Sequence, residues 1–226
     1  MPEFVNPKYA DASKTTFKKP TRLECMMQDF PTVLEGEEVK RVGFTSVSSE
    51  LCFSPVKNAT TDGVALQEKG VHPATAATGE ADQYKAYRLL MRSIGCNVEE
   101  GVDRQYAGIN VTLGPAIVLK PSFACCPGEY KVRFPTPEKV KISGRSTLIV
   151  RGQGVVIESL DLDGALVIDC AYGETVTIKD RVVKNEGWKF VADESSTDEI
   201  IKMRGYQLVR KQTQSVQQDF NGCAVL

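Results

Sequence analysis

The stretch Thr147–Cys170, TLIVRGQGVVIESLDLDGALVIDC, decides the fold of the chain. Its short apolar runs, such as Thr147–Val150 and Val155–Ile157, alternate with glycine, serine and aspartate, and each has the length of a buried strand. The turns come too often for an immunoglobulin-like sandwich, in which they recur about every eight to twelve residues. Short stacked strands of a parallel β-helix fit better, because each turn buries its apolar side against the next. The repeat is irregular, so a small sandwich or a jelly roll stays open.

The same pattern extends to both sides of this stretch and stops upstream at Pro115. Apolar bursts recur from Ala116 to Val183, whereas the residues before Pro115 show loops and helical periods. The last segment is rich in glutamine and poor in apolar residues, which is typical of disorder. We therefore expect an α/β part over residues 1–112, an all-β part over 113–210 and a disordered tail over 211–226.

Secondary structure can be predicted for several stretches of the first part. Thr21 and Glu24 fit a capping box, so we expect a helix from about Arg22 to just before Pro31. Two short stretches, 41–45 and 50–53, are typical of strands, and residues 58–78 of a long mobile loop. A strongly amphipathic helix is expected over 78–94, ended by a glycine at position 95.

Lys57 is the main candidate for a functional residue, because it follows a predicted strand that Pro55 ends. The crevice beyond strand ends binds ligands in open α/β sheets, and a flexible ammonium there suits a phosphate. Asn58 adds an amide donor and an acceptor for a sugar hydroxyl or a phosphate oxygen. Arg22, in the first turn of a predicted helix, could also reach a phosphate. Taken alone, the run Pro55–Asn58 is explained better by an ordinary solvated lysine.

Composition restricts the kinds of protein that fit the chain. The 226 residues carry a formal net charge of −1, so no nucleic-acid partner is expected. No apolar run reaches transmembrane length, and the start is unlike a signal peptide. The seven cysteines lack metal-ligand spacing, so we assign no metal ligand and expect free thiols in the cytoplasm. His72, the only histidine, is interpreted as a loop residue, which excludes a serine–histidine mechanism unless His72 itself takes part.

Motifs spread over nearly the whole chain point to one family. They are Phe4–Tyr9 (FVNPKY), Phe17–Asp29 (FKKPTRLECMMQD), Phe53–Asn58 (FSPVKN), Ala77–Glu80 (ATGE) and Leu160–Ile168 (LDLDGALVI). In this order they resemble the C-terminal part of the UDP-sugar pyrophosphorylases, relatives of the UDP-glucose and UDP-N-acetylglucosamine pyrophosphorylases. The run TRLECMMQD is the most specific part, because helix formation alone does not require that order.

The resemblance implies both a fold and a reaction. The fold is the α/β end of a Rossmann-like nucleotidyltransferase domain followed by a parallel β-helix of the left-handed type. The reaction is uridylyl transfer, in which UTP and a sugar 1-phosphate give UDP-sugar and pyrophosphate with Mg²⁺. Lys57 matches the family's phosphate-binding lysine, and Asn58 and Arg22 are weaker candidates for the same substrate site. A lysine is the expected residue type, because such a step needs anions aligned and their charge neutralised.

One departure from the family pattern limits this expectation. The glycine-rich loop that holds uridine and triphosphate is absent from these residues, and so are the family's metal-binding aspartates. We therefore expect the rest of the enzyme to be the partner of this chain and to bind most of the Mg²⁺, and the chain alone to be inactive. Two alternatives stay open: a UDP-N-acetylglucosamine pyrophosphorylase, and a non-catalytic structural or oligomerisation module.

The last four residues, Cys223–Leu226, match the C-a-a-X prenylation pattern. No basic cluster precedes them, and a match of this length arises easily by chance. A membrane is therefore expected as a partner only if Cys223 is prenylated.

Overall fold

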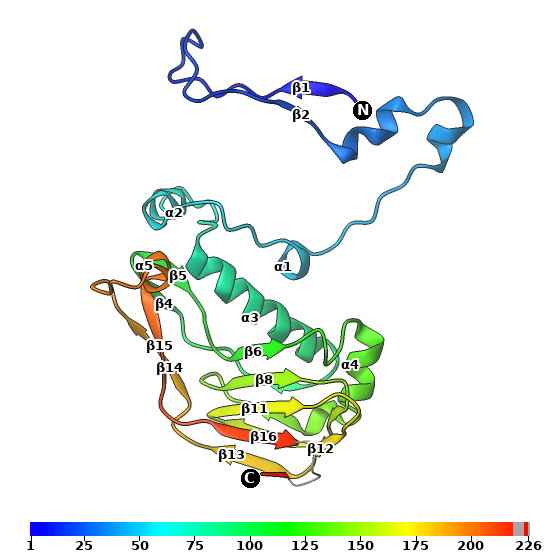
Figure 1. Ribbon diagram of the computed structural model, residues 1–226, viewed down its shortest axis with the longest axis vertical. Helices are drawn as coiled ribbons and strands as arrows, with labels where there is room; N and C mark the ends of the chain where they lie inside the picture. The colour runs from blue at the N-terminus through cyan, green and yellow to red at the C-terminus, as the bar shows by residue number, and fades with distance from the viewer. Residues whose placement is uncertain (219–223, 226) are drawn as a thin grey trace. The chain divides into compact units, whose positions relative to one another are not determined.

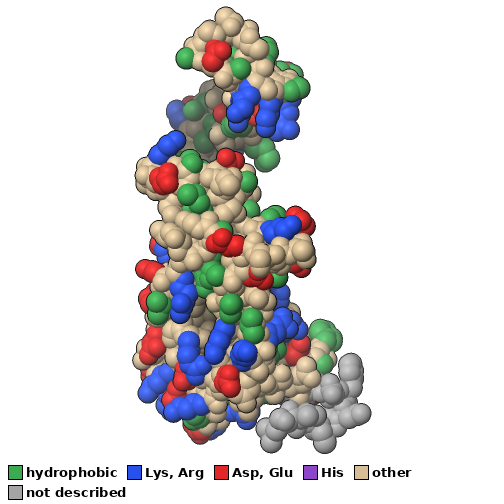
Figure 2. Space-filling view, turned by 90° about the vertical axis from the view of Figure 1, so that its left-hand side faces the viewer, with side chains coloured by type: hydrophobic (Ala, Val, Ile, Leu, Met, Phe, Trp, Pro, Cys, Tyr) green, Lys and Arg blue, Asp and Glu red, His purple; other side chains and the backbone are tan. Residues whose placement is uncertain are grey.

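The computed structural model describes residues 1–218 and 224–225. The chain forms two compact units, Met1–Val47 and Ser48–Leu226, and Figure 1 labels many of their helices and strands. Lysine and arginine side chains are interspersed with aspartate and glutamate on the face in Figure 2, in keeping with the net charge of −1. No helix in these ranges is long and apolar enough to cross a membrane.

The first unit is built from short elements. Strand β1 (Glu3–Val5) pairs antiparallel with β2 (Leu23–Cys25). Two 3-10 helices follow, η1 (Met27–Val33) and η2 (Gly36–Arg41). No residue from 1 to 47 is buried, so this unit has no apolar core of its own.

Two predictions for this unit are wrong. The helix expected from Arg22 is replaced by β2 and η1, because residues 23–25 pair with β1 and place Glu24 opposite Phe4. A local capping pattern therefore gave way to strand pairing. The strand expected over 41–45 does not form, since η2 runs to Arg41 and the next residues have no ladder partner in the described part of the chain.

Helices open the second unit, where two further predictions are wrong. Residues 50–53, expected to be a strand, belong to the single helical turn α1 (Ser49–Cys52) and its C-cap. The expected long loop contains α2 (Thr60–Gln67). The Gln67 amide donates to Gly108 O at 3.1 Å, and such long-range contacts are not visible in local composition. Lys57 therefore lies between two helices and not beyond a strand end.

The amphipathic helix predicted over 78–94 is confirmed as α3 (Ala76–Ser93). It begins two residues earlier than predicted, with Thr75 as the N-cap, and Thr78 Oγ1 accepts a hydrogen bond from Thr75 N at 3.0 Å. It ends as expected before Gly95, whose φ of +106° favours glycine. Its buried side includes Ala77, Ala81 and Met91.

The remaining strands of the second unit are short. The first group comprises β3 (Asn97–Val98), β4 (Arg104–Tyr106), β5 (Ile109–Val111) and β6 (Ala116–Leu119). After α4 (Pro127–Arg133) and the 3-10 turn η3 (Pro137–Lys139) come β7 (Val140–Ile142), β8 (Thr147–Arg151), β9 (Val155–Ile157), β10 (Leu160–Asp163), β11 (Ala165–Cys170), β12 (Val176–Ile178) and β13 (Arg181–Lys184). The apolar bursts of the sequence are therefore confirmed as strands.

Strands β4 and β5 pair antiparallel with each other, and the other strands form three small parallel sheets. One has the order β13-β10-β7-β3, and the third pairs β12 with β9. The second contains β11-β8-β6, with the C-terminal strand β16 (Gln214–Gln218) next to β11. The chain visits the sheets in turn, because β7, β8 and β9 are followed by β10, β11 and β12 in register. Figure 1 shows β6, β8, β11 and β16 side by side.

The core of the unit lies among these sheets. Ile117, Leu148, Val150, Ile157 and Ile168 are fully buried members of one cluster. Alternate residues point inward in β7 and β9, where a less buried residue stands between two buried ones. Met91 of α3 packs into the same cluster, so the helix covers part of the sheets.

The C-terminal segment adds a hairpin and further strands. Strand β14 (Trp188–Ala192) pairs antiparallel with β15 (Tyr206–Arg210), and α5 (Glu199–Arg204) lies between them in sequence. Strands β16 (Gln214–Gln218) and β17 (Ala224–Val225) follow. Because β16 pairs with β11, the predicted disorder is wrong for residues 214–218. The predicted tail also includes 219–223 and 226, which lie outside the described residues, Cys223 among them.

The fold class is therefore mixed α/β with several small parallel sheets. No β-helix is assigned within the described ranges, so only this coarser part of the predicted fold is established. The boundary predicted between residues 112 and 113 falls inside the second unit, and the division there stays a prediction.

Candidate functional site

Lys57 lies on a segment that runs along α3, and we call residues 50–58 the Lys57 strap. Three residues of α3 hold it from one side of the helix. Lys85 forms an ion pair with Glu50. Asp82 Oδ2 accepts a hydrogen bond from Ser54 Oγ at 2.8 Å. A Cβ on Gly79 would overlap the Val56 side chain, so the lack of a side chain on Gly79 lets the strap lie close against the helix.

The backbone of the strap is fixed at Lys57 itself. The amide nitrogens of Lys57 and Asn58 both donate to Ala74 O, at 2.9 and 3.1 Å. Asn58 Nδ2 donates to Pro73 O at 2.9 Å, which leaves the Asn58 side-chain oxygen for another partner. The Lys57 side chain is exposed and makes no ion pair within the described residues. A free ammonium therefore extends from a tightly held backbone.

The acceptor of these bonds is a strained residue. Ala74 has a φ of +51°, in the left-handed region that a residue with a Cβ seldom adopts, and it is buried. Such strain is typical of sites where the surrounding structure dictates a backbone conformation. Here it turns Ala74 O toward the strap.

A cavity of about 840 Å³ lies beside the strap. Two of its lining residues, His72 and Pro73, neighbour Ala74, and the others come from α3 and from the β4–β5 region. The volume falls in the range of small-molecule pockets. The polar and charged side chains that line it are His72, Thr78, Asp82, Lys85, Arg88, Glu100, Asp103, Arg104, Gln105, Asn110 and Thr112.

A buried arginine forms part of the cavity wall. The Arg88 side chain is 3% exposed, and its Nε lies 3.3 Å from Glu100 Oε2. Burial lowers the pKa of Arg88, and the Glu100 carboxylate opposes that shift. Glu100 also pairs with Arg92, so one carboxylate serves two guanidinium groups. Arg88 is therefore committed to structural contacts.

A second polar cluster joins α3 to the C-terminal hairpin. Both oxygens of Glu80 are used: Oε1 accepts from Tyr84 OH at 2.7 Å, and Oε2 accepts from Tyr206 OH at 2.7 Å and from Arg204 at 3.0 Å. Burial raises the pKa of both tyrosines, with a further contribution from the Glu80 charge. Every member has a partner, so this cluster ties elements together and offers no free group.

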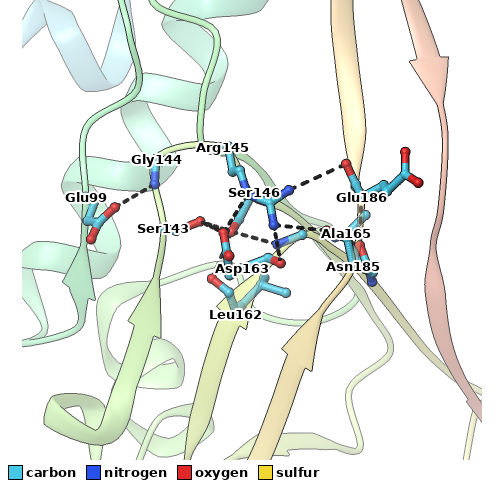
Figure 3. Close-up of polar contacts among 12 residues, drawn as sticks. Glu99, Ser143, Gly144, Arg145, Ser146, Leu162, Asp163, Ala165, Asn185 and Glu186 are labelled. Carbon is cyan, nitrogen blue, oxygen red and sulfur yellow. Dashed lines mark hydrogen bonds and ion pairs between the residues drawn. The ribbon is translucent and has the colours of Figure 1, made fainter.

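The network in Figure 3 joins the turns between successive strands. Arg145 Nε lies 2.7 Å from Asp163 Oδ1, and Arg145 also donates to Asn185 O at 3.0 Å. The Asn185 side chain donates to Ala165 O and accepts from Ala165 N, at 3.0 and 2.8 Å. Hydrogen bonds from Arg145 and Ser143 lower the pKa of Asp163. These contacts link consecutive turns of the chain and are structural.

The predicted site residues are brought together only in part. Lys57 and Asn58 are adjacent on the strap. Arg22 belongs to the first unit, where its exposed side chain pairs with Glu24 at 3.4 Å. Of the three predicted residues, Lys57 and Asn58 therefore share the strap, and Arg22 lies in the first unit.

The described residues offer no metal site of the usual kind. They contain no group of three or more His, Cys, Asp or Glu side chains that could hold an ion. Mg²⁺ prefers carboxylate ligands together with substrate phosphates. These residues therefore do not fit a dedicated Mg²⁺ site, and no chemical step can be assigned to the ion on this part of the chain.

Sequence reasoning missed the residues that hold the strap. His72 is more than a loop residue, because its Nδ1 accepts from Ala74 N at 3.2 Å and its Nε2 lies 3.5 Å from Asp82 Oδ2. Gly79 could have indicated a close contact on this helix from the sequence alone, because a glycine in a helix interior destabilises the helix and usually has a packing reason. Ser54 and Asp82 carried none, because their contact joins residues 28 positions apart.

Comparison with known proteins gives consistent relatives. The chain is 37% identical over 221 residues to a UDP-sugar pyrophosphorylase of Arabidopsis thaliana. The aligned residues make up 94% of this chain and 35% of that protein. The chain is also 34% identical over 208 residues to a UDP-sugar pyrophosphorylase of Oryza sativa subsp. indica. Here the aligned residues make up 91% of this chain and 33% of that protein. The chain thus spans about a third of the length of these curated relatives. No family model matches it.

Proposed function

We propose that this chain, a homologue of the C-terminal third of the plant UDP-sugar pyrophosphorylases, is part of a nucleotidyltransferase that makes UDP-sugar. In the reaction, a phosphate oxygen of the sugar 1-phosphate attacks the α-phosphorus of UTP. A new phosphorus–oxygen bond forms as the bond to the leaving pyrophosphate breaks. The protein's task is to align two anions and neutralise their charge.

The observation that carries the proposal is the way Lys57 is held. Its amide nitrogen is fixed on Ala74 O, while its ammonium is free of ion pairs within the described residues. A rigid backbone with a mobile cationic head suits a sugar phosphate, which approaches as a solvated dianion. Lys57 would thus contact the phosphate. Asn58 Oδ1 would accept from a sugar hydroxyl, and Arg22 would be a further phosphate contact.

The three parallel sheets support a β-helix as the form of the C-terminal part. The chain passes from sheet to sheet in a constant order, and each strand pairs in parallel register with its counterpart one turn later. That order is the one a parallel β-helix produces. The left hand of the coil, a division at residues 112 and 113, and the Rossmann-like ancestry of the first part follow from the family resemblance.

The rest of the enzyme is the proposed partner of this chain. About two thirds of each plant relative has no counterpart here. The unburied first unit supports the idea, because apolar side chains such as Met27, Phe30 and Phe44 are 84%, 53% and 96% exposed. A covering polypeptide would bury them.

The missing part would bind uridine and most of the Mg²⁺, so the chain alone should not turn over. The cytosol is the proposed location.

The test is kinetic and uses an enzyme that contains this segment. Lys57→Ala should lower kcat/KM for the sugar 1-phosphate by roughly a hundredfold, the scale of one lost charge contact to a reacting phosphate. The melting temperature should not change. Lys69→Ala, at another exposed lysine of the second unit, is the matched control and should leave both values unchanged.

Two outcomes would contradict the proposal. Equal activity of the Lys57→Ala and Lys69→Ala variants would favour a non-catalytic structural module. A strong preference of the unmodified enzyme for N-acetylglucosamine 1-phosphate over other sugar phosphates would favour a UDP-N-acetylglucosamine pyrophosphorylase.

A further inference from the structure

We propose that Asp82 of α3 is a positioning residue for Lys57, acting through Ser54 and His72. The inference rests on the proposed role of Lys57 in holding the sugar phosphate. The contacts that carry it do not depend on that role.

The first contact reaches the strap directly. Ser54 Oγ donates to Asp82 Oδ2 at 2.8 Å, and Ser54 precedes Lys57 by three residues. Between them lies Val56, which packs over Gly79 of the same helix. Gly79, Asp82 and Lys85 are spaced by three residues, so they share one face of α3. They meet Val56, Ser54 and Glu50 in turn, and the strap therefore runs antiparallel to the helix.

The second contact reaches the strap indirectly, through His72. Nε2 of His72 lies 3.5 Å from the same Asp82 oxygen, and Nδ1 accepts from Ala74 N at 3.2 Å. Since Nδ1 accepts a hydrogen bond, the proton of the neutral ring belongs on Nε2, which faces the carboxylate. Asp82 thereby selects the ring form that can hold Ala74.

Ala74 passes this constraint on to Lys57. The left-handed conformation of Ala74 directs its carbonyl oxygen at two amides of the strap, those of Lys57 and Asn58. A residue with a Cβ keeps this conformation only when its neighbours impose it. The His72 bond to Ala74 N does so on one side. The hydrogen bond from Thr75 N to Thr78 Oγ1, 3.0 Å long, does so on the other.

The two contacts converge on one carboxylate, and this convergence distinguishes Asp82 from an ordinary surface aspartate. The Asp82 side chain is 30% exposed. Asp169, at 35%, pairs with Arg151 on the surface of the sheets and has no contact with the strap. The two aspartates are exposed to a similar extent, but only Asp82 contacts Ser54 of the strap and His72. Asp169 is therefore the matched control.

The experiment measures amide hydrogen exchange in the 226-residue chain, residue by residue. Asp82→Ala should lower the protection of the Lys57 and Asn58 amides by about tenfold, as expected for a local opening. Protection of Ile168, in the core, should not change. Asp82→Asn should have a smaller effect, because its amide oxygen still accepts from Ser54. Asp169→Ala should leave the strap unchanged.

A second pair of variants tests the path through His72 without touching Asp82. Asparagine can place its amide oxygen near the position of Nδ1, so His72→Asn should keep the protection of Lys57. His72→Ala removes the acceptor and should lower it. Equal protection in these two variants, or unchanged strap protection in Asp82→Ala, would overturn the inference.

Kinetics separate this inference from the proposed function. In an enzyme containing the segment, Asp82→Ala should raise KM for the sugar 1-phosphate and leave KM for UTP unchanged. If strap protection falls in Asp82→Ala but Lys57→Ala has normal kinetics, Asp82 positions the strap and the proposed role of Lys57 is wrong. If Lys57→Ala is impaired and strap protection does not depend on Asp82, the function stands and the positioning role is wrong.

Discussion

The two units of the chain differ in how their apolar side chains are used. In residues 1–47 no side chain is buried, and Phe44 is 96% exposed. In the second unit Leu148, Ile157 and Ile168 are fully buried among the parallel sheets. Burial of apolar surface is the main favourable term in folding and must offset the entropy of ordering the chain. The second unit therefore has an apolar core of its own, whereas the first unit has none among its described residues.

The largest effect is expected in the core of the second unit. Leu148→Ala removes buried methyl groups and leaves a cavity, so the free energy of unfolding should fall by roughly 2–5 kcal/mol. Denaturant unfolding of the 226-residue chain measures this. A loss below about 0.5 kcal/mol, typical of surface sites, would show that the core is not where the burial pattern places it.

A glycine contact gives the next largest effect. A Cβ on Gly101 would overlap the Gly114 backbone, so Gly101→Ala should destabilise the second unit by about 1–3 kcal/mol. Gly43, in the first unit, has nothing within 4 Å of the corresponding position. Gly43→Ala is therefore the control and should not lower the unfolding midpoint. Equal effects of the two substitutions would remove the distinction between the units.

A smaller effect is expected from pH at the Asp163 turn. The pKa of Asp163 is lowered by hydrogen bonds from Arg145 and Ser143, so the ionised form is favoured in the folded state. The contribution of ionised Asp163 to the stability of the folded state is present above the ordinary aspartate pKa. It is lost as the pH falls through the lowered pKa of the folded state. The Tm advantage of the unmodified chain over Asp163→Asn should therefore shrink below about pH 4. A constant difference from neutral to acidic pH would contradict this.

The smallest effect is expected in the first unit. Phe44→Ser replaces an almost fully exposed ring, so the stability of the 226-residue chain should change by no more than about 0.5 kcal/mol. The same substitution in an enzyme containing the segment should destabilise it if a partner surface covers Phe44. Thermal unfolding of the 226-residue chain and of the longer enzyme, each with and without the substitution, measures both effects. A large loss of stability in the 226-residue chain would mean that Phe44 is already buried there.

Local signals predicted some parts of this molecule and not others. The bursts at Thr147–Val150 and Val155–Ile157 became strands, because strand period and buried length agree with their packing. The helix expected from Thr21 and Glu24 did not form, since pairing of residues 23–25 with β1 outweighed a capping pattern. Lys57 could be singled out by resemblance alone. Its supports, Ser54 and Asp82, are far apart in sequence and no local pattern joins them.

Hydrogen exchange over residues 1–47 tests the difference between the units most directly. It should be measured in the 226-residue chain and in a UDP-sugar pyrophosphorylase that contains this segment. We expect amides of residues 1–47 to exchange fast in the short chain and to become protected in the longer enzyme, while residues 140–178 are protected in both. Strong protection of residues 1–47 in the short chain, or none in either protein, would contradict the account.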